Sequence, residues 1–488
     1  MARGQLMKGT RHVPTMKILT DAQVDQVHEA TLAILGRTGV RLDGPDAIQR
    51  LVKDGAVRKE GTQNVVLFPR SMVEDSLNRV PRFRKYFARN PKNDIVWDGE
   101  HTFAGSVGGN PSMLDMATGE PHPSTLADVE QSTRVMDALE NCHAISNFVV
   151  ATDVPGELQV VKTVEAMIKN TSKCVSSYAL NTENVDALAK MWSCLTGGLE
   201  GLRKRPLFCV YGSPSSPLTF DRNTCEIMIR GAELGVPIDI VPCPMCGGTA
   251  PVTLAGGLAQ QNAELMAGIM LYQTVDDSLP TCYSGRLTTL DLRTGANLWG
   301  TAELGLASAA AVQIAHRYHM GADVYGVVSD VNAYDMQMGL ERMMTGLIPA
   351  LAGADMLSGI GGAWGTSSAF EMLVLDNEIY GDIFRALRGI KVDEDRLATS
   401  VIDRVGHMGN FLAQPHTMKY LKLGELRISD LWDKRGSDRF KKEGFKPTQE
   451  RAKAVVRKIL SEHEPEPLDR DVTRQLERVV KEASKSLT

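Results

Sequence analysis

From His101 onward, short apolar runs alternate with longer segments whose apolar residues recur at helical spacing. Repeated alternation of this kind predicts a parallel sheet with helices on its outer surface. The predicted strands are Phe103–Val107, Ala144–Ala151, Lys173–Leu180, Pro206–Gly212, Pro237–Val241, Thr281–Arg286, Asp323–Ser329 and Asp355–Gly359. The predicted helices that follow them are Thr125–Glu140, Glu157–Lys169, Val185–Cys194, Asn223–Leu234, Leu254–Tyr272, Trp299–His319, Met336–Leu351 and Glu371–Leu387.

Eight strand–helix pairs favour a closed (β/α)8 TIM barrel, which typically takes ~250 residues, and we assign residues 101–390 to it. The triplet Gly-Ala-Asp occurs at Gly321–Asp323 and at Gly353–Asp355, each time between a predicted helix and a predicted strand. A doubly wound open α/β sheet has the same alternation and is the rival fold. No GxGxxG or Walker motif opens any of these helices, which disfavours a nucleotide-binding version of the rival.

The segments on either side of the barrel have a different character. Residues 1–100 predict an α+β segment, in which Thr20 and Gln23 form a capping box that starts an amphipathic helix. A second helix is expected over Pro45–Asp54, with short strands at Val65–Phe68 and Ile95–Trp97. Residues 391–488 predict a charged helical extension with helices at Gln449–Ser461 and Asp471–Lys485. The pattern favours a solvated appendage, and dimer contacts are the alternative. A homo-oligomer is expected as well.

Composition narrows the class of protein. The 54 Lys and Arg nearly balance the 59 Asp and Glu, for a formal charge of −5, so no excess of positive charge indicates nucleic acid or an anionic membrane. No apolar run approaches the ~18 residues of a membrane span, and Met1–Lys17 lacks the apolar core of a secretory signal. The eight cysteines between Cys142 and Cys282 lie mostly in apolar runs, which favours buried thiols in a reducing cytoplasm over disulfides.

Aromatic residues, only 6% of the chain, recur at or just beyond the ends of the predicted strands. Such residues either fill the barrel or line a pocket at its mouth, where TIM-barrel active sites lie. An aromatic box suits a quaternary ammonium ion, which has no N–H to donate. Arg286 directly follows a strand and is either a clamp for a substrate carboxylate or half of a structural ion pair. The predicted substrate-binding residues are Tyr178, Tyr211, Tyr283, Arg286, Tyr334 and Trp364.

Glycines cluster at the same strand ends. They let the backbone approach a large flat ligand closely, although ordinary turns also use them. A phosphate cradle is disfavoured because the P-loop spacing and its lysine are absent. The predicted cofactor-binding glycines are Gly105, Gly108, Gly247, Gly248, Gly361 and Gly362.

Metal and hydrolase chemistry have little support in the sequence. Cys243 and Cys246 form a C-x-x-C pair, but no second pair of ligands has the spacing of a structural zinc site. His316 and His319 share a predicted helix far from the strand ends, and no G-x-S-x-G elbow occurs. We therefore expect no tightly bound metal.

Two motifs resemble the trimethylamine methyltransferase family. The first runs from Val241 to Thr253 (VPCPMCGGTAPVT) and continues to Gln260, Asn262, Ala263 and Glu264. The second is Ser329-Asp330 followed by Asp335-Met336-Gln337-Met338-Gly339, and the Gly-Ala-Asp triplets fit as well. The likeness extends from about Thr20 to the region of Trp432.

This resemblance implies a TIM-barrel enzyme that moves a methyl group from an amine to the Co(I) of a corrinoid (cobalamin) carried by a small partner protein. Founding members of the family carry pyrrolysine, which the resemblance places near Met336 or Gln337, where this chain has ordinary residues. The departure implies the non-pyrrolysine branch and a quaternary amine such as glycine betaine, proline betaine or carnitine. It also marks Asp335 and Gln337 as the catalytic candidates.

The chemistry agrees with a quaternary amine. Such a substrate leaves as a neutral tertiary amine, so no acid is needed, and the nucleophile belongs to the cofactor. The protein needs only to align the methyl group and desolvate the cation. Two alternatives remain: a non-catalytic barrel that binds quaternary amines as a sensor or buffer, and a metal-dependent lyase or hydrolase on the same fold.

Overall fold

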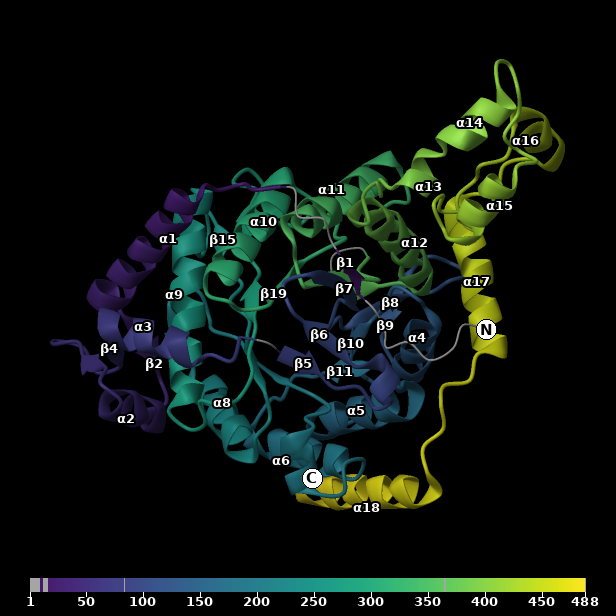
Figure 1. Ribbon diagram of the computed structural model, residues 1–488. Coiled ribbons are helices and arrows are strands. Elements are labelled where there is room, and N and C mark those ends of the chain that lie inside the picture. Colours follow the sequence, from purple (N-terminus) through teal and green to yellow (C-terminus); the bar gives the residue numbers. More distant parts are fainter. Residues whose placement is uncertain (1–8, 12–15, 83, 364–365, 488) are drawn as a thin grey trace.

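Eight parallel strands form a closed barrel in the computed structural model, which describes residues 9–11, 16–82, 84–363 and 366–487 (Figure 1). The barrel strands are β7 (His101–Ser106), β10 (Ala144–Ser146), β11 (Cys174–Ser176), β12 (Val210–Gly212), β14 (Ile238–Ile240), β16 (Tyr283–Gly285), β19 (Ala322–Tyr325) and β20 (Met356–Ile360). Six of them pair in the order β11-β10-β7-β20-β19-β16, and β12 pairs with β14. The pairing of β20 with β7 closes the ring and confirms the predicted TIM barrel.

Two weaker links complete the ring. A parallel bridge between Ser177 and Val210 joins β11 to β12. The Thr281 hydroxyl donates to the Ile238 carbonyl over 2.8 Å, which joins the start of β16 to β14. The hydrogen-bonded strands are shorter than predicted, because the apolar runs continue beyond the end of each ladder into buried loops.

All eight helices predicted between the strands are present around the barrel. They are α4 (Leu126–Ala138), α5 (Gln159–Asn170), α6 (Thr182–Ser193), α8 (Arg222–Leu234), α9 (Leu254–Gln273), α10 (Ala302–Arg317), α11 (Met336–Ala352) and α12 (Phe370–Leu387). Short additions in the connecting loops are α7 (Leu199–Lys204), β8 (Ser112–Leu114), β9 (Pro121–Pro123), β13 (Thr219–Phe220), β15 (Met245–Cys246), β17 (Thr288–Leu290), β18 (Asn297–Leu298) and β21 (Ser367–Ser368).

The N-terminal segment packs on the side of the barrel and covers the end at which the barrel strands start. Its elements are α1 (Asp21–Ala33), β2 (Val40–Leu42), α2 (Pro45–Lys53), β3 (Val57–Arg58), β4 (Val65–Leu67), α3 (Arg70–Arg79), β5 (Arg84–Tyr86) and β6 (Ile95–Trp97). The predicted capping box of Thr20 and Gln23 starts α1, which packs on α9. The β5–β6 hairpin covers the strand starts, where Tyr86 donates to Asp239 of β14 over 2.6 Å and Arg84 pairs with the same carboxylate.

The C-terminal extension has two parts. Helices α13 (Glu394–Leu397), α14 (Thr399–Val405), α15 (Pro415–Lys422) and α16 (Ser437–Glu443) project from the barrel (Figure 1). Helix α17 (Thr448–Glu462) packs on α12 and α4, and α18 (Arg470–Leu487) packs on α5 and α6. The expectation of a solvated appendage is therefore wrong for α17 and α18, because side chains such as Val456 and Leu476 are buried against the barrel helices. None of the described helices is both long and apolar enough to cross a membrane.

Candidate active site

A cavity of about 330 Å³ opens at the carboxyl ends of the barrel strands. This is the end at which TIM barrels place their active sites. Side chains at or just beyond the end of every barrel strand line it, so the whole ring of strands fixes its shape. The lining residues are Ser106, Val107, Gly108, Gly109, Ser146, Asn147, Tyr178, Tyr211, Ser213, Val241, Cys243, Arg286, Tyr325, Val328, Ser358 and Gly359.

Hydrogen bonds of hydroxyl groups join the neighbouring strands that form one wall of the cavity. Tyr211 of β12 donates to the Ser176 hydroxyl of β11 over 2.6 Å, and the Ser146 hydroxyl of β10 lies 2.9 Å from the Ser176 hydroxyl. Ser106 of β7 accepts from the Ser146 backbone N–H over 2.9 Å. Neighbouring strands are thus joined through side chains as well as through the ladder, which holds the Tyr211 ring in place.

A buried ion pair forms the opposite wall. Arg286, directly after β16, contacts Asp323 of β19 through Nη2 and the carboxylate Oδ2 over 2.6 Å. Its Nη1 donates to the Asp323 carbonyl over 2.7 Å, and Ser358 donates to Asp323 Oδ1 over 2.8 Å. The Nε donor of Arg286 has no hydrogen-bond partner among the described residues. The structural ion pair considered for Arg286 is therefore present, and one of its donors remains unused.

The charge states follow from burial and from this pairing. Burial alone would lower the pKa of Arg286, but the Asp323 carboxylate raises it above its ordinary value, so the guanidinium stays charged. Burial raises the pKa of Tyr178 to about 12 and the pKa of Tyr211 above its usual range, so both phenols are neutral near pH 7. Desolvation also raises the pKa of the Cys243 thiol, which therefore stays protonated.

Four of the predicted site residues meet in this cavity: Tyr178, Tyr211, Arg286 and Gly108. Tyr325 was not among the predicted residues, and its ring centroid lies 5.1 Å from the Arg286 guanidinium carbon. Asp323 was not predicted as a partner of Arg286 either. Because the apolar run continues to Val328, the strand was expected to end at Ser329, whereas β19 ends at Tyr325. Alternation of side chains from Asp323 would have placed Tyr325 on the same face.

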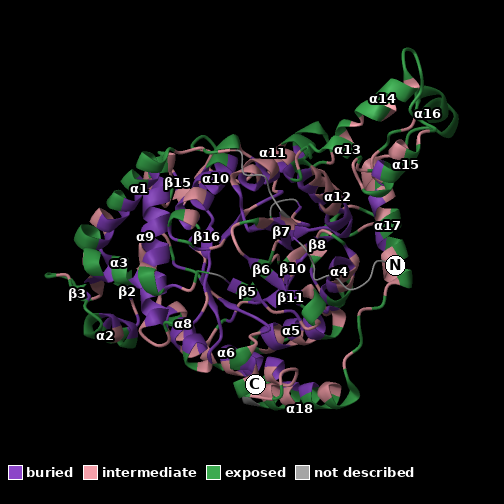
Figure 2. Cartoon of the chain, viewed as in Figure 1, coloured by how far each residue is buried: buried purple, intermediate pink, exposed green. Residues whose placement is uncertain are grey.

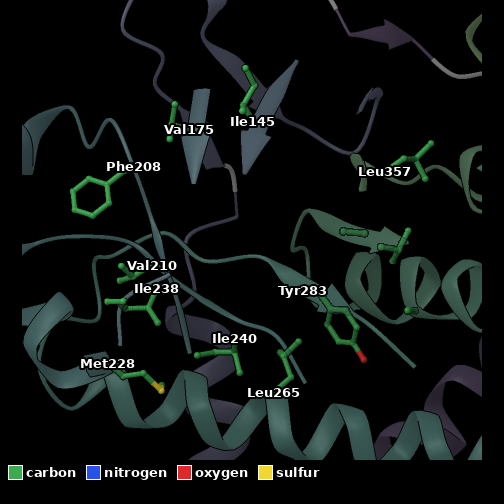
Figure 3. Packing of buried hydrophobic residues seen from close by; sticks show 14 of the residues in the cluster. Ile145, Val175, Phe208, Val210, Met228, Ile238, Ile240, Leu265, Tyr283 and Leu357 are labelled. Carbon is green, nitrogen blue, oxygen red and sulfur yellow. The ribbon is translucent and has the colours of Figure 1, made fainter. Parts of the chain in front are cut away.

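Two of the predicted aromatic residues, Tyr283 and Tyr334, do not line the cavity. Tyr283 is fully buried, and its ring belongs to the same hydrophobic cluster as Ile240 and Leu265 (Figure 3). Because Arg286 points into the barrel, strand alternation directs Tyr283 to the other face. Tyr334 donates to Glu371 over 2.9 Å and lines a separate cavity between α11 and α12. Trp364 lies outside the described residues.

The two catalytic candidates lie at the start of α11 and not in the cavity. Asp335 caps α11 by accepting from the Met338 backbone N–H over 3.0 Å. Gln337 is exposed and donates to Glu341 Oε1 over 2.6 Å, while Glu341 Oε2 accepts from the Ser329 hydroxyl over 2.7 Å. These contacts stabilise the loop between β19 and α11, which is a structural role, and neither side chain reaches the cavity lining.

The predicted cofactor glycines divide into two groups. Gly108 lines the cavity, and Gly247 and Gly248 form a turn after β15 beside Leu290. Gly105 instead lies within β7, where a Cβ atom would meet Met356 Sδ at 3.3 Å, so it permits close strand packing. A Cβ atom on Gly361 would collide with Phe148 at 2.5 Å, and Gly362 accepts from Arg342. Gly105 and Gly361 therefore have packing reasons of their own, whereas a Cβ atom on Gly362 would meet no heavy atom closer than 3.7 Å.

The cysteines and histidines considered for zinc do not converge. All eight cysteines are free, Cys243 is exposed toward the cavity and Cys246 is buried. Among the residues that the structure describes, no three His, Cys, Asp or Glu side chains lie close enough to hold a metal ion.

The sequence matches the model of one protein family, described as trimethylamine methyltransferase (MTTB), over residues 2–488. The chain is 31% identical to trimethylamine methyltransferase MttB of Desulfitobacterium hafniense (strain DSM 10664 / DCB-2), covering 95% of this chain and 93% of that protein. It is 29% identical to the glycine betaine methyltransferase of D. hafniense strain Y51, covering 97% and 98%.

The fold is similar to that of a solved methyltransferase. Monomethylamine methyltransferase MtmB of Methanosarcina barkeri superimposes with a TM-score of 0.51 at 13% identity, covering 96% of this chain and 88% of that one. At this identity the likeness concerns the fold alone, while the match of the family model extends over almost every residue. The chain therefore belongs to the trimethylamine methyltransferase family.

Proposed function

We propose that this methyltransferase removes a methyl group from a small quaternary amine that also carries a carboxylate, with glycine betaine as the simplest example. The observation that carries the proposal is the cavity itself, in which Tyr178, Tyr211 and Tyr325 stand beside the Arg286–Asp323 pair. Arg286 is the one charged side chain among the described lining residues, and Asp323 behind it balances that charge, so an overall neutral zwitterion matches the site better than a lone ion does.

The tyrosine rings suit the ammonium end of the substrate. A trimethylammonium group has no N–H, so it is held by ring faces and by nearby negative charge rather than by hydrogen bonds. Tyr178 and Tyr211 are neutral, and the Tyr211 hydroxyl already donates to Ser176. The face of the Tyr211 ring is therefore held in one position while its polar end is satisfied.

The carboxylate end has a donor available in the same cavity. Arg286 remains charged and keeps an unused Nε–H after pairing with Asp323. Ser358, which contacts both Asp323 and Arg286, limits the movement of the guanidinium. A carboxylate that accepts from Nε would extend the ion pair into a network of three charged groups. Hydrogen bonds between charged groups are stronger than those between neutral groups, so this contact would favour binding.

The protein's task in the reaction is to orient and desolvate. As the methyl group departs, the substrate cation loses its charge, so aromatic walls that exclude water favour the transition state over the ground state. The Cys243 thiol is protonated and is therefore a poor methyl acceptor. No side chain in the lining is required as an acid, because the leaving group is a neutral amine.

The acceptor in this proposal is a corrinoid carried by a partner protein, as family membership implies. When bound, the corrinoid supplies the Co(I) nucleophile. The cavity of about 330 Å³ is too small for a corrin macrocycle, so the ring would cover the mouth rather than enter it. Exposed apolar side chains from three strand–helix connections and from the start of α11 lie at the same end of the barrel as that mouth, and we call them the rim: Leu180, Val252, Leu292, Met336 and Leu340.

The glycine-containing loops support the same docking. Gly108 lines the cavity, and Gly247 with Gly248 lies beside the loop that carries Leu292. A flat macrocycle could approach the backbone closely at these positions, since no side chain intervenes. The rim would contact the carrier around the corrin ring, because exposed apolar side chains that lie together often mark interaction sites.

Methyl transfer from glycine betaine to free Co(I) cobalamin, followed by its visible spectrum, tests the proposal directly. We expect turnover with the purified chain and none without it. Binding of glycine betaine without any transfer, to free cobalamin or to a corrinoid protein, would contradict the proposal.

Replacing Tyr178 with leucine is expected to weaken binding of glycine betaine about thirtyfold. A desolvated cation–π contact contributes about 2 kcal/mol, and each 1.4 kcal/mol is a tenfold change. Tyr178→Phe is the matched control, because it keeps the ring and should bind almost as the parent does. Isothermal titration of both variants measures the effect, and equal affinities would mean that this ring does not face the cation.

Replacing Leu292 with glutamate is expected to raise the KM for the corrinoid partner about tenfold and to leave glycine betaine affinity unchanged. Leu292 is 68% exposed on the rim, so the charge would disturb docking without disturbing the cavity. Val57→Glu is the control, since Val57 is 52% exposed on the distant strand β3. An unchanged KM for Leu292→Glu would remove this part of the rim from the docking surface.

A further inference from the structure

A second cavity, called the side cavity here, lies between α11, α12 and the chain segments on either side of α16. Its volume is about 380 Å³, close to that of the active-site cavity. Figure 2 shows α16 exposed, in contrast to α12, much of which is buried. Apolar side chains from the two barrel helices form much of the wall, among them Met338, Met372, Leu375 and Ile379.

Three aromatic side chains line the side cavity: Tyr334, Trp432 and Phe445. The Tyr334 hydroxyl donates to Glu371, and the Trp432 indole N–H donates to Asp382 Oδ2 over 2.7 Å. Because their polar ends are held by these bonds, the rings of Tyr334 and Trp432 have fixed positions. Rings of this kind suit a fully methylated ammonium group, which has no N–H to donate.

The side cavity also contains a buried arginine. Arg342 is only 2% exposed, although it lines the cavity. Its Nη1 donates to both carboxylate oxygens of Asp376 over 2.9 Å, and its Nη2 donates to the Gly362 carbonyl. Its Nε is buried and has no hydrogen-bond partner among the residues that the structure describes. A buried donor without a partner is unfavourable, so a ligand that brings an acceptor to Nε would be favoured.

The charges of the side cavity match a zwitterion. Burial raises the pKa of Asp376 to about 6, so this carboxylate is ionised at pH 7 and balances Arg342. Asp335 lines the same cavity two helical turns before Arg342 and is exposed. A lone anion would be repelled by the two carboxylates, and a lone cation by the guanidinium. A molecule with an ammonium group near Asp335 and the rings, and a carboxylate at Arg342, avoids both penalties.

We infer that the side cavity binds a second molecule of a small betaine, separate from the one in the active-site cavity. The inference rests on the proposed function for the choice of glycine betaine as the ligand. The two cavities offer the same chemistry, since each has aromatic rings beside an arginine that is paired with an aspartate. Tyr334 and Asp335, which were predicted for the active site, both line the side cavity.

Arg342 also connects the side cavity to the active-site cavity. Its Nη1 donates to the Val327 carbonyl over 3.0 Å, and the next residue, Val328, lines the active-site cavity. Its Nη2 contacts Gly362 in the loop after β20, a strand whose Gly359 lines the active-site cavity as well. A carboxylate held at Nε would therefore act on both loops, so betaine in the side cavity should change the rate of methyl transfer.

Isothermal titration of the full-length protein with glycine betaine tests the inference. We expect two sites per chain in the parent and one in Arg286→Gln, which leaves only the side cavity. In that background, Trp432→Leu should weaken the remaining site about tenfold, because it removes a ring from the cation. Trp432→Phe is the matched control, since it also loses the bond to Asp382 but keeps a ring, and it should bind almost as Arg286→Gln alone does. Should the double variant not fold, Trp432→Leu alone should weaken one of the two parent sites by the same factor.

The crossed variants separate this inference from the proposed function. A single parent site that Arg286→Gln abolishes would overturn the inference and leave the proposed function standing. A single parent site that Trp432→Leu weakens and Arg286→Gln leaves intact would support the inference and contradict the proposed function. Binding that remains in Arg286→Gln and ignores Trp432→Leu would also overturn the inference.

Rates of methyl transfer test the connection through Arg342. Over glycine betaine concentrations that span both dissociation constants, the parent rate should depart from a single hyperbola. Trp432→Leu should move the second phase to about tenfold higher concentration. A parent with two sites and a single hyperbola would overturn this connection.

Discussion

Replacing Arg286 with glutamine is expected to lower kcat/KM for glycine betaine by at least about a hundredfold. A hydrogen bond to a charged group contributes about 1.5–3 kcal/mol, and removing one partner of a buried ion pair costs about 3–5 kcal/mol. Both effects apply, because the Asp323 side chain is only 10% exposed and would lose its cation. Initial rates of methyl transfer over a range of substrate concentrations measure the loss.

Two comparisons separate substrate binding from structural support. The double variant Arg286→Gln/Asp323→Asn removes both charges, so it should recover most of the melting temperature lost in the single variant but little of the glycine betaine activity. Choline lacks a carboxylate and should lose less activity than glycine betaine does. Equal losses for the two substrates would mean that Arg286 only supports the barrel.

The preference for a betaine over trimethylamine is expected to be as large as the effect of replacing Arg286. Glycine betaine, proline betaine or carnitine should exceed trimethylamine in kcat/KM by at least about a hundredfold, because trimethylamine has no carboxylate to occupy the donor on Arg286. A site that hydrogen-bonds a substrate group strongly rejects an analogue that lacks it, since its buried polar groups are left unpaired. The five compounds, choline included, should be compared under one set of conditions.

Each outcome of that comparison is informative. Trimethylamine as the best substrate would refute the quaternary-amine proposal, because the segment at Met336 and Gln337 contains no pyrrolysine. Choline above every betaine would refute the carboxylate contact and would leave the tyrosine rings as the binding feature. Family membership already favours a methyltransferase over a barrel that only binds amines and over a metal-dependent lyase or hydrolase.

The architecture was predictable because periodicity is a local property. Apolar spacing located all eight outer helices, and the capping box at Thr20 marked the start of α1. Part of the site followed from the rule that barrel strands end at the active site, which identified Tyr178, Tyr211 and Arg286. The same rule also selected Tyr334, which lines a different cavity. The reason is that an apolar run does not reveal where the hydrogen-bonded strand ends.

The sequence by itself determined the barrel, its order of strands and the family motifs, since these depend on residues that are near one another in the chain. Only the tertiary structure decided which side chains meet. It paired Arg286 with Asp323, brought Tyr325 into the cavity and turned Tyr283 into the core. It also separated α17 and α18, which pack on the barrel helices, from α13, α14, α15 and α16, which project from the barrel. The direction of a side chain across the barrel wall and its distant neighbours depend on strand register and closure, which no local pattern specifies.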